Sequence, residues 1–258
     1  MSKVTNLKIT CLSEESAPRL PFWGAHGLSF LIEADGKKIL FDTGSYSDVL
    51  SHNSQSLNFD LSTIDAFFLS HTHDDHSGGL FGISNDIKDK PMYCTSDAFS
   101  DRMPESEELK KIMTNVNIIS HDKEIFPGVI VIKEEKSINP KYPVNESFIV
   151  ADLEGKGLIL ILGCSHPGIE HIIDRVKLIF EGIPIHAIVG GLHLKDSSDE
   201  EIARLVSLIK KEKIQIVLAN HCTGFKALKE LSTELPEATK FITDTVTGSF
   251  HTGKEYIF

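Results

Sequence analysis

Residues 64–79 read Ile64-Asp65-Ala66-Phe67-Phe68-Leu69-Ser70-His71-Thr72-His73-Asp74-Asp75-His76-Ser77-Gly78-Gly79. The first half has the apolar composition of a buried strand, and the second half supplies imidazoles and carboxylate directly after it. At this spacing His71 and His73 can converge on one metal ion while Asp75 and His76 reach a second, and zinc takes such ligands readily. A solvated histidine-rich turn is the alternative, but clusters at ligand spacing usually mark a metal or catalytic site.

The motif His71-x-His73-x-Asp75-His76 resembles the signature of the metallo-β-lactamase superfamily. Two further hallmarks have counterparts in this chain, an Asp after an early strand at Asp42 and a late His after another strand at His221. The resemblance implies an α/β fold, namely a four-layer αββα metallo-β-lactamase-like sandwich with metals at one edge of its two sheets. No linker divides the chain, so we expect a single domain over residues 1–258.

Four further stretches are similar to one branch of that superfamily, named for dihydropterin-(ribofuranosyl)aminobenzene-phosphate synthase. The similarity runs from about Leu28 to about Gly224 and implies a reaction that displaces diphosphate from a pterin-methyl carbon while metals hold the phosphates. The stretches are Leu28-Ser29-Phe30-Leu31-Ile32-Glu33, Gly163-Cys164-Ser165-His166-Pro167-Gly168, Gly190-Gly191-Leu192-His193-Leu194 and His221-Cys222-Thr223-Gly224.

The candidate ligands each follow an apolar strand, so we expect them to gather at one sheet edge. The first ion is expected at His71, His73 and His166, and the second at Asp75, His76 and His221. The superfamily carries a bridging Asp where this chain has Gly163-Cys164. His166 therefore either fills the third-ligand position from a different loop or replaces the bridge, and a single tight ion with a weak second site remains an alternative.

Other residues near these motifs have two readings each. The glycines before His193 let the backbone approach a ligand closely, so His193 is expected to donate a proton or contact substrate, unless it is a structural histidine at a strand end. We expect Asp42 to fix the tautomer of a ligand histidine through a hydrogen bond, unless it is an ordinary turn residue. Cys164 and Cys222 lie beside candidate ligands, so either can bind metal, although buried packing is the commoner role of cysteine. His26 either lines the pocket or lies in a segment that covers the core.

The composition restricts the partners. The chain has 258 residues, of which 41% are hydrophobic and 24% charged, as in an ordinary soluble protein. A net charge of −11 argues against nucleic-acid binding and leaves a small anionic substrate open if metals neutralise it. The four cysteines form no CxxC pair, which argues against a structural zinc module or a disulfide framework. No signal peptide or run of 18 apolar residues is visible, so we expect a cytoplasmic protein without a membrane partner.

Periodicity predicts hairpins followed by strand–helix units, an order that suits two packed sheets with helices outside. Turns are expected at Asp35-Gly36 and Glu154-Gly155-Lys156, a capping box at Ser198 and Glu201, and a short helix capped by Ser45. The region from about Ile83 to Asn117 is weakly periodic and contains Pro91 and Pro104, so we expect a mobile cover near the site. Strands are predicted at 4–12, 28–33, 38–41, 64–69, 92–94, 128–133, 148–153, 157–162, 185–189 and 214–218, and helices at 169–180 and 227–235.

These features predict a metal-dependent hydrolase or transferase that acts on an ester, phosphoester or pterin-diphosphate-type substrate through a metal-activated water or metal-held phosphates. Asp75 and His193 are the expected catalytic residues. The expected cofactors are two divalent metal ions, zinc first and manganese or iron as alternatives. A di-iron redox protein is a second hypothesis, weakened because such sites carry Glu where this chain has His73. A metal-binding module without turnover is a third, and the acidic charge disfavours a nuclease.

Overall fold

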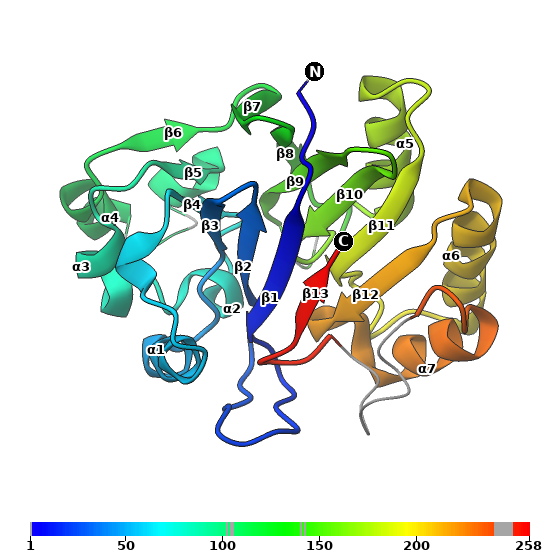
Figure 1. The fold of residues 1–258 in the computed structure, drawn as a ribbon, viewed down its shortest axis with the longest axis horizontal. Coiled ribbons are helices and arrows are strands. Elements are labelled where there is room, and N and C mark those ends of the chain that lie inside the picture. The colour runs from blue at the N-terminus through cyan, green and yellow to red at the C-terminus, as the bar shows by residue number, and fades with distance from the viewer. Residues whose placement is uncertain (1, 102, 104–105, 140, 142, 240–249) are drawn as a thin grey trace.

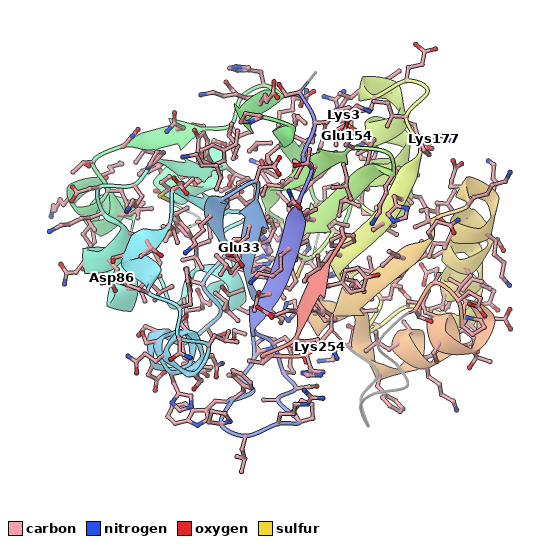
Figure 2. All side chains as sticks on the ribbon, viewed as in Figure 1. Lys3, Glu33, Asp86, Glu154, Lys177 and Lys254 are labelled. Atoms are coloured by element: carbon pink, nitrogen blue, oxygen red, sulfur yellow. The ribbon has the colours of Figure 1, made fainter. Side chains whose placement is uncertain are left out.

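The computed structural model describes residues 2–101, 103, 106–139, 141, 143–239 and 250–258. Two sheets lie face to face and helices cover the outer side of each, which confirms the predicted four-layer αββα sandwich (Figure 1). Exposed charges such as Asp86 and Lys177 lie on the outer helical layers (Figure 2). Among the described residues, no helix combines the length and the apolar character that a membrane crossing needs. The expected single domain stays a prediction.

The first sheet places the early strands beside one another. The turn between β2 and β3 uses Asp35 and Gly36 at φ 46° and 83°, which confirms the predicted hairpin. From β3 to β6 the strands are parallel, so their carboxyl ends meet at one edge. In spatial order the strands are β13 (Glu255–Ile257), β1 (Leu7–Ser13), β2 (Ser29–Ala34), β3 (Lys37–Phe41), β4 (Ala66–Leu69), β5 (Met92–Cys94) and β6 (Val116–Ile118).

The second sheet is built from the later half of the chain. The predicted hairpin across residues 154–156 joins β9 to β10, and β10, β11 and β12 run parallel to one another. Their carboxyl ends also meet at one edge, which positions three loops together. In spatial order the strands are β12 (Ile216–Asn220), β11 (Ile185–Gly191), β10 (Gly157–Leu162), β9 (Asn145–Leu153), β8 (Val129–Lys136) and β7 (Lys123–Phe126).

The helices form the outer layers, apart from the short α2 (Asp74–Ser77), which carries part of the histidine motif. The capping box at Ser198 and Glu201 is confirmed. The predicted Ser45 cap is wrong, because the helix begins at Ser47 after Tyr46, which makes no side-chain cap. The other helices are α1 (Ser47–Ser56), α3 (Ser84–Ile87), α4 (Ser106–Ile112), α5 (Ile169–Ile179), α6 (Asp199–Glu212) and α7 (Gly224–Glu234), with 3-10 turns η1 (Leu61–Thr63), η2 (Phe81–Ile83), η3 (Ser96–Phe99) and η4 (His221–Thr223).

Three apolar layers separate the four layers of the sandwich. Along β10, Leu158 and Leu160 face the helices while Ile159 and Ile161 face the other sheet. Successive side chains of a strand point to opposite faces, so a strand that is apolar throughout is buried on both sides. The continuous apolar runs of the sequence therefore correspond to strands in the middle of the sandwich.

The segment between Ile83 and Asn117 differs from the expected mobile cover. Its described part supplies β5, β6, α3 and α4, and apolar side chains such as Ile87, Met92 and Leu109 are buried between the first sheet and its helices. The elements are too short for clear periodicity, and the charges mark their exposed faces. The cavity described below is not lined by the described residues of this segment. Pro104 lies outside the described residues, and the segment's mobility stays a prediction.

Candidate metal centre

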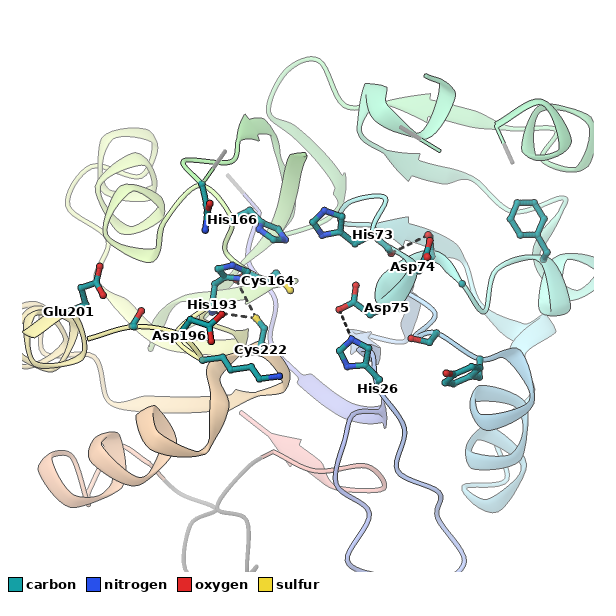
Figure 3. A pocket seen from close by; sticks show the side chains of 18 residues that line it. His26, His73, Asp74, Asp75, Cys164, His166, His193, Asp196, Glu201 and Cys222 are labelled. Atoms are coloured by element: carbon teal, nitrogen blue, oxygen red, sulfur yellow. Dashed lines mark hydrogen bonds and ion pairs between the residues drawn. The ribbon is translucent and has the colours of Figure 1, made fainter. Parts of the chain in front are cut away.

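Loops from both sheets meet around one cavity of about 1030 Å³ (Figure 3). The loop after β4 brings the histidine motif, and the loops after β10, β11 and β12 bring His166, His193 and His221. Figure 3 shows His73, Asp75, His166 and His193 around the same space, as expected for ligands that each follow a strand. The lining residues are His26, Ser45, Tyr46, His73, Asp74, Asp75, Ser77, Gly78, Phe81, Asn139, Cys164, His166, His193, Lys195, Asp196, Ser197, Glu201 and Cys222.

His71 is fully buried and lies at the centre of a histidine cluster. Its ring centroid is 4.8 Å from that of His73, 4.0 Å from that of His76 and 4.8 Å from that of His166. Burial and the neighbouring imidazoles hold the pKa of His71 well below its usual value, so the ring is neutral. Among the described residues its Nε2 has no hydrogen-bond partner. A buried, neutral, unpartnered ring nitrogen is suited to a metal ion.

Asp42 controls the tautomers of two of these histidines. Its carboxylate accepts the Ser70 hydroxyl proton at 2.7 Å and the His76 Nδ1 proton at 2.6 Å. Because the Ser70 Oγ–H is donated to Asp42, Oγ accepts the proton of His71 Nδ1 at 2.9 Å. Both rings therefore present Nε2 as an acceptor toward the site. The predicted hydrogen bond from Asp42 to a histidine of the motif is confirmed.

A second cluster joins His76, Asp75, His221 and Glu15. His221 Nδ1 lies 2.9 Å from Glu15 Oε1 and its Nε2 lies 3.3 Å from Asp75 Oδ2. Burial would lower the pKa of His221, but these two carboxylates raise it well above its usual value. Burial likewise opposes ionisation of Glu15, yet the bond to His221 lowers the pKa of Glu15 to about 2. Sequence reasoning missed Glu15, which belongs to no short motif and lies 206 positions from His221.

His26 bridges the same carboxylates from the cavity side. Its Nδ1 lies 2.9 Å from Glu15 Oε1. Its Nε2 lies 3.4 Å from Asp75 Oδ2, a contact that Figure 3 shows as a dashed line. The His26 side chain is 63% exposed and lines the cavity. Of the two alternatives for His26, the structure therefore shows the position in the pocket.

Glu146 holds the loop that carries Cys164 and His166. Its buried carboxyl accepts the backbone N–H groups of Cys164 at 2.8 Å, Ser165 at 3.0 Å and His166 at 2.6 Å. Burial nevertheless raises the pKa of Glu146 to about 7. Gly163 leaves the space that this arrangement needs, since a Cβ there would lie 2.9 Å from Glu146 Oε1. Sequence reasoning missed Glu146, which stands 18 positions before Cys164.

His193 and Cys222 complete the wall next to His166. The ring centroids of His193 and His166 are 4.5 Å apart, and the His193 N–H donates to Cys222 Sγ at 3.3 Å. That donor is the backbone N–H of His193; a separate hydrogen bond between the imidazole and Cys222 raises the pKa of His193, against the effect of burial. His193 also adopts φ 52°, and Asp42, Ser165 and His221 share this left-handed region. Such conformations cost free energy and concentrate at functional sites.

Donor atoms of suitable chemistry approach within 4.8 Å of one another in several groups of three. These groups include five of the six predicted ligands, and the sixth, His73, stands with its ring centroid 4.7 Å from that of His166. Imidazole, carboxylate and thiolate donors in such numbers fit a divalent metal. The groups are His71–Cys164–His166, His76–Cys164–His221, Cys164–His193–Cys222, Glu15–His26–His221 and His71–Asp75–His76.

Comparisons with known proteins agree with this fold. The metallo-beta-lactamase superfamily profile matches residues 23–174, and the chain belongs to that superfamily. Within it, a relative from Methanocaldococcus jannaschii, 7,8-dihydropterin-6-methyl-4-(beta-D-ribofuranosyl)-aminobenzene-5'-phosphate synthase, is 33% identical over 92% of this chain and 94% of its own length.

Solved structures show the same fold. The crystal structure of a metal-dependent hydrolase of the beta-lactamase superfamily has a TM-score of 0.78 and 25% identity, covering 97% of this chain and 98% of its own. The crystal structure of a diphosphatase has a TM-score of 0.59 and 17% identity, covering 99% of this chain and 98% of its own. This likeness shows the fold alone.

Proposed function

We propose that the protein is a metal-dependent enzyme that cleaves a bond to phosphate or diphosphate in an anionic small molecule, by transfer or by hydrolysis. The observation that carries this proposal is the buried Nε2 of His71, which has no hydrogen-bond partner in the described part of the chain and lies within a cluster of imidazole donors beside the cavity. Asp42 sets the tautomer of His71 through Ser70. This arrangement suits a metal ligand rather than a packing residue.

The donor set fits two divalent ions, with zinc first and manganese or iron as alternatives. His71, His73 and His166 would hold one ion, and Asp75, His76 and His221 would hold the other. When bound, such ions supply Lewis-acid catalysis, because they neutralise phosphate charge and activate a nucleophile.

The chain's own residues would perform the remaining steps. Asp75 would accept a hydrogen bond from the attacking group and so orient it. His193 lines the cavity, and the Cys222 sulfur beside it raises the pKa of its imidazole. His193 can therefore hold a proton near neutral pH and donate it to the leaving-group oxygen. Asp42 and Glu15 would keep the histidine rings fixed during the reaction.

The cavity supports a phosphate-bearing substrate larger than a simple ester. Its volume of about 1030 Å³ lies at the upper end of small-molecule sites. Lys195 is the one Lys or Arg among the described lining residues, so an anion would depend chiefly on the metals. The full-length similarity to the synthase favours a transfer in which a pterin-methyl C–O bond to diphosphate breaks, a C–N bond to an aminobenzene forms, and the amine loses a proton.

Metal analysis followed by product analysis tests the proposal. Protein loaded with zinc, manganese or iron would be incubated with a pterin-methyl diphosphate, with and without an aminobenzene ribotide, and with simple phosphodiesters. A condensation product identifies the transferase, and amine-independent release of phosphate or diphosphate identifies the hydrolase. His71→Ala should lose metal and both activities, whereas His121→Ala, at an exposed position, should lose neither. Wild-type protein that retains no metal after loading would refute the proposal.

A further inference from the structure

Cys164 lies where the two proposed ligand groups come together. Its Sγ forms one close group of donors with His71 and His166 and another with His76 and His221, and in each group all donor atoms lie within 4.8 Å of one another. It is also 3.2 Å from His76 Nε2. One sulfur atom is therefore near a donor of each proposed ion.

The position of this sulfur is fixed by the fold. Cys164 is buried, and its backbone N–H donates to Glu146 Oε1 at 2.8 Å. Gly163 before it leaves no room for a side chain, since a Cβ would lie 2.4 Å from Ser70 Oγ. The loop after β10 is thereby held against the loop after β4, with the thiol between them. A mere packing residue does not require this placement among ring nitrogens.

We infer that the Cys164 thiolate is a shared ligand that binds both ions. The inference rests on the proposed metal centre and names the anionic atom at its middle. In the described residues, the two groups that join Cys164 to His71 and His166 and to His76 and His221 contain imidazoles and no carboxylate. A thiolate supplies the negative charge there, and sulfur has enough lone pairs for two bonds. Metal binding replaces the thiol proton, which passes to solvent.

Donor spacing is compatible with this role. Donors on one tetrahedral zinc ion lie roughly 3.5 Å apart, given Zn–S and Zn–N bonds of about 2.3 and 2.0–2.1 Å. The groups here fall within 4.8 Å before any ion draws them together. A competing arrangement is a separate soft-metal site at Cys164, His193 and Cys222, which form their own close group. The two arrangements differ in whether Cys222 is needed.

X-ray absorption of the zinc-loaded Cys222→Ala variant distinguishes the two arrangements. In this variant Cys164 is the cysteine that remains beside the proposed ligands. At two zinc ions per chain, a shared thiolate gives about one sulfur per zinc in the shell at about 2.3 Å. A terminal thiolate on one ion gives about half a sulfur per zinc, and this value would overturn the inference. Cys222→Ser, which is closer in shape, serves if the Ala variant does not fold.

Variants of Cys164 give a second measurement. Cys164→Ala should bind no more than one zinc ion per chain, whereas Cys164→Asp should restore two ions without the 2.3 Å shell, because a carboxylate can also join two metals. Two ions in both Cys222→Ala and Cys164→Ala would refute the shared ligand and leave the proposed function intact. Wild-type protein that binds no zinc would instead refute the metal centre itself.

Discussion

Glu146→Gln should make the metal-free protein more stable relative to wild type as the pH rises. The carboxyl of Glu146 is buried and accepts three backbone N–H groups, two at Oε1 and one at Oε2. These bonds favour the charged form, but burial disfavours it more and raises the pKa to about 7. Gln has nearly the same shape and no charge, so it resembles the protonated acid.

The size and sign of the effect follow from this pKa. A rise from 4.5 to about 7 corresponds to about 3 kcal/mol of free energy between the two protonation states. The folded chain binds this proton more tightly than the unfolded chain does. The contribution of this proton to the free energy of unfolding of the wild type is therefore fully present below pH 4.5 and is lost as the pH rises through about 7. The Glu146→Gln variant has no such titration. Its free energy of unfolding relative to that of the wild type should therefore increase by about 3 kcal/mol between pH 4.5 and 8.

Urea unfolding of both metal-free proteins across this pH range measures the effect. Midpoints and slopes should be compared as differences between the two proteins, which cancels the contribution of other titrating groups. Glu33→Gln on β2 provides a matched control, because that carboxylate lies on the other sheet. If the wild type instead gains stability relative to Glu146→Gln with rising pH, the three N–H bonds lower the pKa of Glu146 more than burial raises it, and the reasoning fails.

The same variant should bind metal less well. The Gln amide meets three N–H donors with only one oxygen, so one donor loses its acceptor and the loop of Cys164 and His166 shifts. Loss of such supporting contacts typically costs 10–100-fold in metal affinity. Chelator competition on Glu146→Gln should show a decrease of this order. Unchanged affinity would mean that Glu146 does not position the loop.

Three further predictions concern the proposed ligands and the contacts that support them. Asp42→Asn should weaken zinc binding about 10–100-fold in chelator competition, because one amide oxygen cannot replace both Oδ1, which accepts the Ser70 backbone N–H, and Oδ2, which accepts from the Ser70 hydroxyl and His76 Nδ1; equal affinity would remove the tautomer argument. His166→Ala should lower bound metal, measured by elemental analysis, more than His193→Ala does, and the reverse order would exchange their roles. Gly163→Ala should lower the free energy of unfolding by about 1–3 kcal/mol, since its Cβ would lie 2.4 Å from Ser70 Oγ; thermal unfolding like that of the wild type would show that the loop can adjust.

Much of the sandwich could be predicted from local pattern. Strands buried on both faces, such as β4 and β10, show as apolar runs, and the Asp35-Gly36 turn fixes a hairpin. The segment from Ile83 to Asn117 could not be interpreted in this way. Its elements have three to seven residues, too few for a helical or strand period to show, and their burial depends on neighbours distant in sequence.

The candidate ligands at 71–76 could be predicted because their spacing is local, and His166 and His221 could be predicted because each follows an apolar strand. The carboxylates that position them could not, apart from Asp42. Glu15 meets His221 across 206 residues and Glu146 meets Cys164 across 18, so neither contact leaves a short motif. For Cys164 the sequence favours packing over the alternative of metal binding, because a buried thiol is usually inert and only the assembled site shows the surrounding ring nitrogens.

The positioning carboxylates suggest how metal binding and folding are coupled. Burial raises the pKa of Glu146, and burial together with the crowded imidazoles depresses that of His71, so the metal-free site disfavours charge on either group. A divalent ion would stabilise the ionised form of Glu146 and would bind the neutral ring nitrogen of His71. Ligand at 100 times its Kd stabilises a fold by about 2.7 kcal/mol, which is similar to the cost of burying one such carboxylate. Glu146, whose burial costs the metal-free protein stability as the pH rises through about 7, thus favours the loaded state, and Glu146→Gln should stabilise the metal-free fold while weakening metal binding.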